Sequence, residues 1–344
     1  MGRSSRNDYD VEALAARTLE LVNIASESRE EAAIVAHVRG LVPGSPAYDH
    51  DTVLFYPGRV VLAGHYDTVP AQGNLPGRVE DGWVVGLGAT DMKGGVAVMI
   101  ELARAGAPFG YLFFGREELP AGESALPRFF ERHGLDAELV VMLEPTDNTI
   151  QAGCLGNLNA ELVFHGKSAH SARPWLGDNA IMRAVEALEP LARLEPHDVE
   201  IEGLVFREVL SVTEIHGGIA TNVIPATTTA TLNFRYAPDR TPEDAEARLR
   251  ELVGDAGELQ LVGNSPPARV AASSPLVRAL RESGGFELEP KQAWTPVAEF
   301  SAQGLDAVNL GPGATRYAHT QDERVEAAAL RQTYDALSRF GESL

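Results

Sequence analysis

The sequence has almost no cysteine. Its single cysteine, Cys154, has no second thiol in the chain with which to form a disulfide. No run approaches the roughly 18 apolar residues of a membrane span, and the first stretch, MGRSSRNDYD, has no apolar segment typical of a signal peptide. Together these absences predict a soluble, cytoplasmic protein from a reducing compartment.

Basic side chains are also scarce. The formal net charge is −20 at pH 7, few of the cations are lysines, and no basic patch stands out. Nucleic acid and an anionic membrane surface are therefore not expected as partners. The glycine-rich segment 86–95 matches neither GxGxxG nor GxxxxGK[ST], which disfavours a phosphate-binding loop and a dinucleotide-dependent dehydrogenase.

Length and pattern predict an α/β protein of two domains. A chain of 344 residues exceeds one ordinary core, and 44% hydrophobic with 23% charged residues is a globular composition. Residues 1–156 and 269–344 alternate helices with buried strands. Residues 157–268 read as strand, helix, long strands, helix and strand, which predicts an inserted α+β sandwich with one helical layer.

Several local signals mark helix starts. Ser26 or Ser28 is the expected N-cap of a helix that ends near residue 40. Thr241 is expected to cap a helix with Pro242 at its first position. Gly94-Gly95 lack side chains, so we expect the backbone to approach a neighbour closely at the start of the helix that follows.

The stretch VVLAGHYDTVP, residues 60–70, places two polar groups at the end of a buried strand. His65 and Asp67 stand two apart, on the same side of an extended chain. An imidazole and a carboxylate there suit a metal ligand with a partner that orients it or exchanges protons. They would equally suit a capped strand end with a satisfied polar pair, so other residues must decide.

Acidic residues end two more predicted strands and begin a helix. They are Asp91, before the helix over 96–105, Glu117 and Glu118, after FGYLFF, and Glu144, after LVVM. The carboxyl ends of strands in a βαβ sheet gather at one edge, so these groups could converge with His65. Like charges in one place require cations, and their number fits two metals sharing a carboxylate better than one zinc. Taken alone, an adjacent pair of glutamates such as Glu117-Glu118 usually lies in a solvated loop.

Other polar residues lie later in the chain. His319 alone would be an exposed loop histidine, but beside the acidic cluster it is the best candidate for a second imidazole. The inserted segment has two polar stretches, one with His170 and Arg173 and one with Asn222 and Arg235. Taken singly, Asn222 could be only a turn and Arg235 only a surface charge.

These pieces, in this order, resemble the M20 family of metallopeptidases and amidohydrolases. The motifs that carry the resemblance are GHYDTVP, GLGATDMKGG, GREEL, LEPT, HGKSAHSARP, TNVIPATTTATLNFR and the late AHT. They cover nearly the whole chain. The resemblance implies a zinc-peptidase-like catalytic domain with a mixed central sheet flanked by helices, and an inserted dimerisation or lid domain.

The resemblance also implies a role for each candidate residue. Two Zn²⁺ per subunit, or Co²⁺ or Mn²⁺ in their place, would be held by His65 and Glu144, by Glu118 and His319, and by a bridging Asp91. Asp67 would orient His65, and Glu117 would be the general base that passes a proton from water to the leaving amine. His170 would reach across a homodimer interface to stabilise the oxyanion in the neighbouring site.

Substrate contacts are implied for five residues of this chain: Asn222, Arg235, Arg173, Thr295 and Gly313. The implied substrate is a small N-acyl amino acid, whose carboxylates Asn222 and Arg235 would bind. Relatives carry an acidic residue where Pro296 follows Thr295 here, and that segment would line the substrate end of the cleft. The departure leaves the acyl group open.

Within the family, LEPT, SAHSARPWLGDNAI and VNLGPGATRYAHTQDERV are most similar to the succinyl-diaminopimelate desuccinylases. This similarity implies hydrolysis of N-succinyl-LL-2,6-diaminopimelate to succinate and LL-2,6-diaminopimelate, in lysine biosynthesis. Acetylornithine deacetylases, carboxypeptidases and aminoacylases share most of the motifs and remain alternatives. A non-catalytic metal-binding scaffold is disfavoured, because a scaffold has no use for the base Glu117.

Overall fold

The structure is a computed structural model that describes residues 11–344. The first stretch, MGRSSRNDYD, which the sequence predicts to lack a signal peptide, lies outside the described residues. The start of the helical region expected from residue 8 lies outside them too. The described part of that region forms α1 (Val11–Val22) and α2 (Ala32–Leu41). Nowhere in residues 11–344 is a helix long and apolar enough to cross a membrane.

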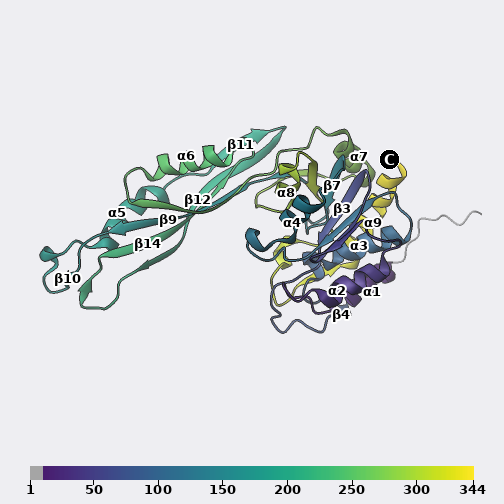
Figure 1. The fold of residues 1–344 in the computed structure, drawn as a ribbon, viewed down its shortest axis with the longest axis horizontal. Helices are drawn as coiled ribbons and strands as arrows, with labels where there is room; N and C mark the ends of the chain where they lie inside the picture. The colour runs from purple at the N-terminus through teal and green to yellow at the C-terminus, as the bar shows by residue number, and fades with distance from the viewer. Residues whose placement is uncertain (1–10) are drawn as a thin grey trace, which may run out of the picture. The chain divides into compact units, whose positions relative to one another are not determined.

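The chain divides into two compact units (Figure 1). Unit 1 runs to Ala152 and also contains Ala271–Glu289 and Glu299–Leu344. Unit 2 contains Gly153–Val270 and the short segment Pro290–Ala298. Unit 2 is therefore an insertion into unit 1 along the chain.

An eight-stranded mixed sheet forms the centre of unit 1, in the order β1-β2-β6-β3-β7-β17-β8-β16. Four neighbouring strands run parallel: β6 (Gly110–Phe114), β3 (Val60–His65), β7 (Leu139–Met142) and β17 (Asp306–Asn309). The outer strands are β1 (Tyr48–His50), β2 (Val53–Tyr56), β8 (Ile150–Cys154) and β16 (Leu288–Lys291). The carboxyl ends of the four parallel strands therefore lie at one edge of the sheet.

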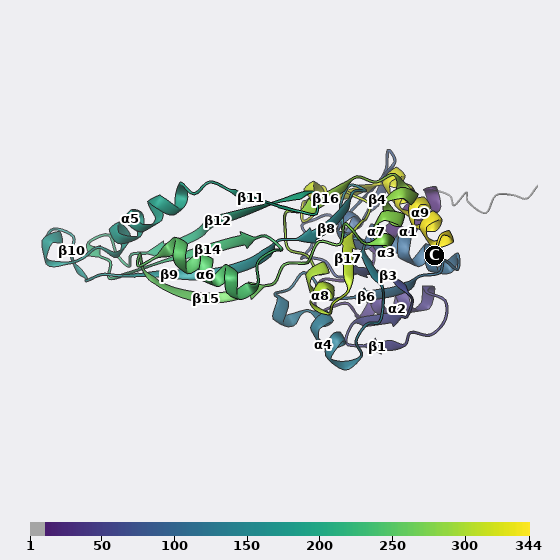
Figure 2. The same ribbon diagram turned by 90° about the horizontal axis from the view of Figure 1, so that it is seen from above.

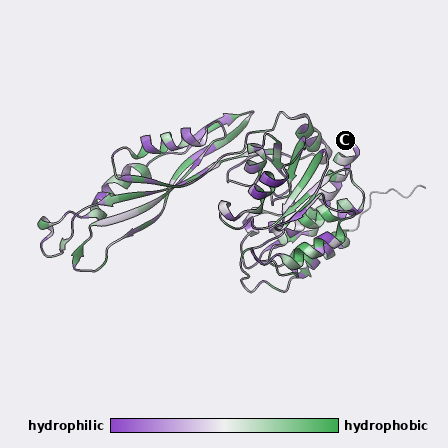
Figure 3. Ribbon diagram, in the orientation of Figure 1, coloured by the Kyte–Doolittle hydropathy of each residue, from purple (hydrophilic) through white to green (hydrophobic). Residues whose placement is uncertain are grey.

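Helices cover both faces of this sheet (Figures 1 and 2). On one face lie α3 (Gly94–Arg104) and α9 (Ala327–Glu342), which pack with α1 and α7 (Pro275–Gly284). On the other lie α4 (Ala125–Arg132) and α8 (Val297–Ala302). These two helices contact each other through the rings of Phe130 and Phe300, whose centroids are 5.6 Å apart. Strands β3, β6 and β7 are buried and hydrophobic (Figure 3), so this is the predicted mixed sheet between helices.

A small three-stranded sheet joins two segments that are far apart in sequence. Strand β5 (Trp83–Val85) pairs antiparallel with both β4 (Arg78–Glu80) and β18 (Arg324–Glu326). The β5 strand precedes the short helix η1 (Ala89–Lys93), and β18 follows the loop that carries His319. The pairing of β5 with β18 therefore brings the segment leading to η1 beside the loop that carries His319.

Unit 2 contains a five-stranded antiparallel sheet in the order β11-β12-β14-β9-β15. The strands are β11 (His197–Ile201), β12 (Leu204–Gly217), β14 (Thr227–Tyr236), β9 (Gly156–His165) and β15 (Glu258–Ser265). Helices α5 (Ala180–Ala192) and α6 (Pro242–Val253) pack on the apolar side chains of β9 and β14 and form one core. The predicted cap of α6 is confirmed, since the Thr241 hydroxyl accepts a hydrogen bond from Asp244 N–H.

The N-cap predicted at Ser26 or Ser28 is wrong. Helix α2 begins at Ala32, and its N-cap position is held by Glu31, whose side chain makes no capping bond. The Ser26 hydroxyl instead donates to the Tyr66 carbonyl at 2.7 Å, and the Ser28 hydroxyl donates to the Asp67 carboxylate at 2.7 Å. Both serines therefore support the loop after β3 rather than a helix end.

The close approach predicted at Gly94-Gly95 is confirmed. A Cβ at Gly94 would lie 2.7 Å from the Ala89 carbonyl oxygen, and one at Gly95 would lie 2.5 Å from the Leu143 carbonyl oxygen. These contacts bring the start of α3 against the end of β7, next to Glu144.

We therefore predict that Gly95→Ala lowers the free energy of unfolding by about 1–3 kcal/mol, because the added methyl overlaps backbone that cannot move aside. Gly40→Ala is the matched control, since nothing lies within 4 Å of its Cβ position in α2. The control should be unchanged or more stable by up to about 1 kcal/mol. Urea unfolding measures both, and equal values for the two variants would contradict the packing described here.

Candidate metal centre

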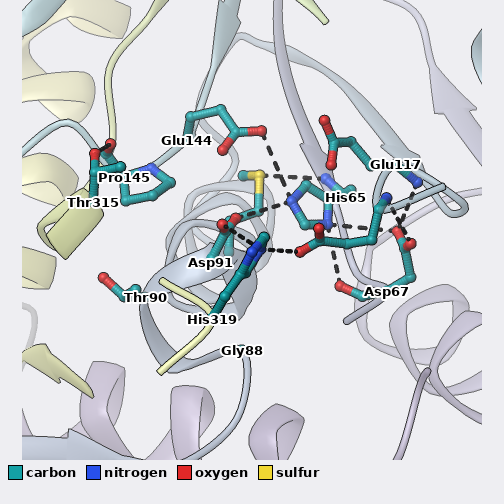
Figure 4. Close-up of polar contacts among 12 residues, drawn as sticks. His65, Asp67, Gly88, Thr90, Asp91, Glu117, Glu144, Pro145, Thr315 and His319 are labelled. Carbon is teal, nitrogen blue, oxygen red and sulfur yellow. Dashed lines mark hydrogen bonds and ion pairs between the residues drawn. The ribbon is translucent and has the colours of Figure 1, made fainter. Parts of the chain in front are cut away.

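The carboxyl edge of the parallel strands carries most of the predicted ligands. His65 is the last residue of β3, Glu117 and Glu118 follow β6, and Glu144 follows β7. These strand ends are level, because His65 pairs in register with Phe114 of β6. Asp91 comes from η1 and His319 from the loop after β17, and Figure 4 shows their side chains facing this edge.

Three groups of three donor atoms meet here: one is His65, Glu117 and Glu118, and the other two share Asp91. Of these two, one is His65, Asp91 and Glu144, the other is Asp91, Glu118 and His319, and the atoms within each group lie within 4.8 Å of one another. His65 Nε2 lies 3.1 Å from Asp91 Oδ1 and 3.8 Å from Glu144 Oε1. His319 Nε2 lies 2.9 Å from Glu118 Oε1 and 3.5 Å from Asp91 Oδ2.

These dimensions suit metal ions. Ligands held about 2.1 Å from a tetrahedral zinc lie about 3.4 Å apart, close to the separations in the two groups that share Asp91. Imidazole nitrogen with carboxylate oxygen is a donor set for zinc, and equally for cobalt or manganese. The five donors are those that the family resemblance assigned to two metals, and their role as ligands stays a prediction.

Asp67 connects the imidazole of His65 to the loop that carries Glu117 and Glu118. Its carboxylate is fully buried and accepts the Ser28 hydroxyl and the backbone N–H groups of Glu117 and Glu118, the latter two at 3.2 Å. The Nδ1 atom of His65 lies 3.1 Å from the Asp67 carbonyl oxygen and 3.5 Å from its carboxylate. This arrangement turns His65 Nε2 toward Asp91 and Glu144.

The charges at the site shift the pKa values of its groups. Burial alone would raise the pKa of Asp67, but the hydrogen bonds from His65, Ser28 and the Glu117 N–H lower it. Burial raises the pKa of Glu117 well above its usual range, and the carboxylates of Glu144 and Glu118 raise it further, against the opposing charge of His65. A glutamate whose pKa is raised in this way is suited to taking up and releasing a proton.

The two histidines differ in burial. His65 is 1% exposed, and hydrogen bonds to Asp67 and Asp91 raise its pKa well above 6.5 although burial opposes this. The His319 side chain is 51% exposed, and its hydrogen bond to Glu118 raises its pKa to about 9. Without cations, both imidazoles therefore take up protons to offset the surrounding carboxylates.

The loop that carries His319 is fixed at several points. The Gln72 side chain donates to the His319 carbonyl at 3.1 Å, and His319 itself has the left-handed φ of 59°. Gly313, predicted to contact substrate, has φ of +88° and a Cβ position 2.1 Å from the Thr90 hydroxyl. Its carbonyl accepts the Asp147 N–H at 2.6 Å. Gly313 thus packs against Thr90, the residue before Asp91, and any side chain at position 313 would overlap it.

Three predicted residues of unit 2 come together on a small ribbon. His170 lies in β10 (Ala169–His170), which pairs with β13 (Val223–Ile224), so that the Ser171 N–H donates to the Asn222 carbonyl at 2.9 Å. The Arg173 N–H donates to the His170 carbonyl at 2.8 Å. The three side chains of His170, Arg173 and Asn222 are exposed.

Arg235 lies near the other end of unit 2, at the carboxyl end of β14. Its Nε donates to Asn233 Oδ1 at 3.0 Å, and Asn233 Nδ2 donates to Asn157 and Asn159, each at 2.7 Å. Burial lowers the pKa of Arg235. Thr295 is buried in the segment that unit 2 takes from the later chain, with its carbonyl 3.9 Å from Cys154 Sγ.

Ser28 contacts the site and was missed from the sequence. Its spacing before a helix with acids in the first turn is the signal of an N-cap, and that signal is stronger than any sign of a role near His65. The double serine, Ser26 and Ser28, at period two is the only local clue, because alternate residues of an extended segment share one face.

The chain is similar in sequence and in fold to known proteins. The model of peptidase family M20/M25/M40 matches residues 61–343. A Mycobacterium tuberculosis protein provisionally named succinyl-diaminopimelate desuccinylase DapE is 38% identical over 341 residues, covering 94% of this chain and 96% of that protein. The succinyl-diaminopimelate desuccinylase of Corynebacterium glutamicum is 36% identical over 299 residues, covering 82% of this chain and 80% of its own.

Solved structures share the fold at lower identity. Aminopeptidase PepT from Bacillus cereus has a TM-score of 0.79 at 20% identity, covering 97% of this chain and 98% of its own. The YXEP protein of Bacillus subtilis, described as a dinuclear metal binding peptidase from the M20 family, has a TM-score of 0.69 at 16% identity, covering 97% and 99%. At such identities the likeness is one of fold.

The metal-free protein is predicted to lose stability as the pH rises from 6.5 to about 9. Folding raises the pKa of His319 over this range, so its contribution is complete below pH 6.5 and is lost as the pH passes about 9. His65 shifts in the same direction. Thermal unfolding of chelator-treated protein at a series of pH values measures this loss.

His319→Ala should reduce that pH dependence, because it removes one of the two histidines whose pKa is raised in the folded protein. The control is His216→Ala, which removes an exposed histidine paired with Glu214 in unit 2 and should leave the slope as in wild type. A slope that is the same in all three proteins would contradict the electrostatics described for His319.

Proposed function

The chain belongs to peptidase family M20 and is a metal-dependent amidohydrolase, and we propose that it uses two metal ions to hydrolyse N-succinyl-LL-2,6-diaminopimelate. The observation that carries the two-metal proposal is that Asp91 belongs to two of the three donor groups. The succinyl substrate is supported by the names of the two relatives above, which match most of the chain.

In this proposal the ligands are His65 and Glu144 for one ion, Glu118 and His319 for the other, and Asp91 for both. Two cations bound there would make a water more acidic and polarise the scissile carbonyl. Zinc is the expected metal, and cobalt or manganese fit the same donors.

Glu117 is the proposed general base. Its carboxylate lies within 4.8 Å of donor atoms of His65 and Glu118, and it is not needed by either group that shares Asp91. As a carboxylate beside the proposed ions, it would accept a proton from the attacking water and deliver it to the leaving amine. Asp67 keeps Glu117 in place, because it accepts the Glu117 N–H at 3.2 Å.

The dimensions of unit 2 support a homodimer. The strand β14 spans Thr227–Tyr236, which is about 30 Å of extended chain, with Asn222 before its start and Arg235 near its end. An acyl amino acid is no longer than an extended tetrapeptide, about 14 Å. If Asn222 and Arg235 both contact one substrate, as proposed, this length favours their coming from two different copies of unit 2.

The surface of unit 2 also suits a second copy of the chain. Helix α5 exposes Met182 at 52% and Val185 at 53%, and β12 exposes Ile215 at 51%. Among the described residues, Val209–Gly217 of β12 pairs only with β14, so its other edge is open for pairing. We propose that this face forms the dimer and that His170 and Asn222 serve the neighbouring site.

Arg235 is the proposed partner of a substrate carboxylate. Its guanidinium, held by Asn233, is a suitable partner for a substrate carboxylate. Such a local cation is needed because a protein with net charge −20 repels an anionic substrate. Arg173, Thr295 and Gly313 remain proposed contacts, and the cytoplasmic location stays a prediction.

The substrate proposal is tested by a hydrolysis assay with N-succinyl-LL-2,6-diaminopimelate, N-acetylornithine and several N-acyl amino acids. We expect kcat/KM for the succinyl substrate to exceed the others by at least about tenfold, because a site built for a second carboxylate rejects compounds that lack it.

Glu117→Gln should bind metal normally and lose about 10²–10⁴ in kcat. Preference for N-acetylornithine would overturn the substrate, and a fully active Glu117→Gln would overturn the base.

The dimer proposal predicts complementation between two inactive proteins. His170→Ala and Glu117→Gln are each expected to be inactive as homodimers. In a mixed dimer, the site with intact Glu117 receives His170 from the Glu117→Gln chain, so an equal mixture should recover about a quarter of wild-type activity. If His170 instead acts in its own chain, subunit exchange restores nothing, which decides between the two arrangements.

A further inference from the structure

Another buried carboxylate, that of Glu323, is bonded to the backbone of the turn that carries Asp91. Its side chain is 1% exposed. Its Oε1 accepts the backbone N–H groups of Thr90 at 3.2 Å and Asp91 at 3.0 Å, and its Oε2 accepts the N–H of Gly88 at 2.9 Å. One side chain therefore fixes three amides of this turn.

The backbone reinforces the same contact. The Glu323 carbonyl accepts the Gly86 N–H at 2.9 Å, so both the main chain and the side chain of Glu323 hold the segment that leads to Asp91. Gly88 has φ of +77°, a left-handed conformation that glycine adopts without cost and that turns its N–H toward Glu323.

The backbone at Asp91 needs such support. Asp91 has φ of −123° and ψ of 94°, which are not helical angles although the residue lies inside η1. Its amide donates to Glu323 Oε1 at 3.0 Å, which fixes the backbone at this irregular residue. Since Asp91 belongs to two of the three donor groups, a shift of its backbone would change both of these groups at once.

We propose that Glu323 is a positioning residue: by accepting the amides of Gly88, Thr90 and Asp91, it holds the Asp91 carboxylate between His65 and His319. This inference rests on the proposed two-metal function and adds a residue to it. Glu323 is not itself a ligand, because both of its oxygens are engaged by amides and it belongs to none of the donor groups found in residues 11–344.

The test compares metal binding by wild type, Glu323→Gln and Glu323→Asp in the full chain without substrate. Glutamine keeps the size of the side chain but turns an NH₂ group toward N–H donors, whereas aspartate keeps the charge with a shorter reach. Competition with a chromophoric chelator gives the Zn²⁺ affinities, and the absorption spectrum of bound Co²⁺ reports the geometry of the ligands.

The matched control is Glu208→Gln in unit 2. Glu208 is a buried carboxylate, 5% exposed, that accepts the Ala237 N–H at 3.0 Å and pairs with Arg240. It should lose stability much as Glu323→Gln does, since both leave a buried carboxylate site unsatisfied. Unlike Glu323, it touches none of the proposed ligands.

We expect Glu323→Gln to weaken binding of both ions by about 10- to 100-fold and to alter the Co²⁺ spectrum, with Glu323→Asp between it and wild type. Glu208→Gln should keep wild-type affinity and spectrum. Wild-type metal binding in Glu323→Gln would overturn the proposal, and if that variant does not fold, wild-type binding in Glu323→Asp would do so. A wild-type protein that binds no pair of ions would overturn the proposed function as well.

Discussion

Mutual repulsion among carboxylates is the constraint on which the site depends. Asp91, Glu117, Glu118 and Glu144 meet at one sheet edge, where little water is available to screen them. Such a cluster is stabilised by cations or by protons on His65, His319 and the Glu117 carboxyl. The surrounding residues are arranged accordingly: Asp67 and Glu323 are satisfied by amides and hydroxyls, so the remaining carboxylates stay directed at the shared space.

The main features of the fold follow from period and punctuation in the sequence. The buried runs before His65, Glu117 and Glu144 became parallel neighbours because apolar strands of that length are buried on both faces only in such a sheet. The convergence of their polar ends then follows from topology alone. Thr241 with Pro242, and Gly94-Gly95, were predictable because each depends on the chemistry of adjacent residues.

Contacts between distant segments were not predictable in the same way. Ser28 bonds Asp67 across 39 positions and Glu323 bonds Asp91 across 232, and neither separation leaves a trace in local composition. Ser28 was misassigned for a physical reason: a hydroxyl that can cap a helix can equally bond any nearby carboxylate. In unit 2, motifs in the sequence identify His170 and Arg235 as candidates. The length of β14, at whose carboxyl end Arg235 lies, is known only from the folded sheet.

The unequal exposure of the two histidines has a kinetic consequence. Under the proposed assignment, an ion held by His65, Asp91 and Glu144 has a fully buried imidazole, whereas its neighbour is held by His319, half of which faces solvent. Ligands that water can reach are displaced sooner, so the two ions would exchange with the surrounding pool at different rates. The enzyme would then carry one resident ion and one whose occupancy follows the availability of free metal around it.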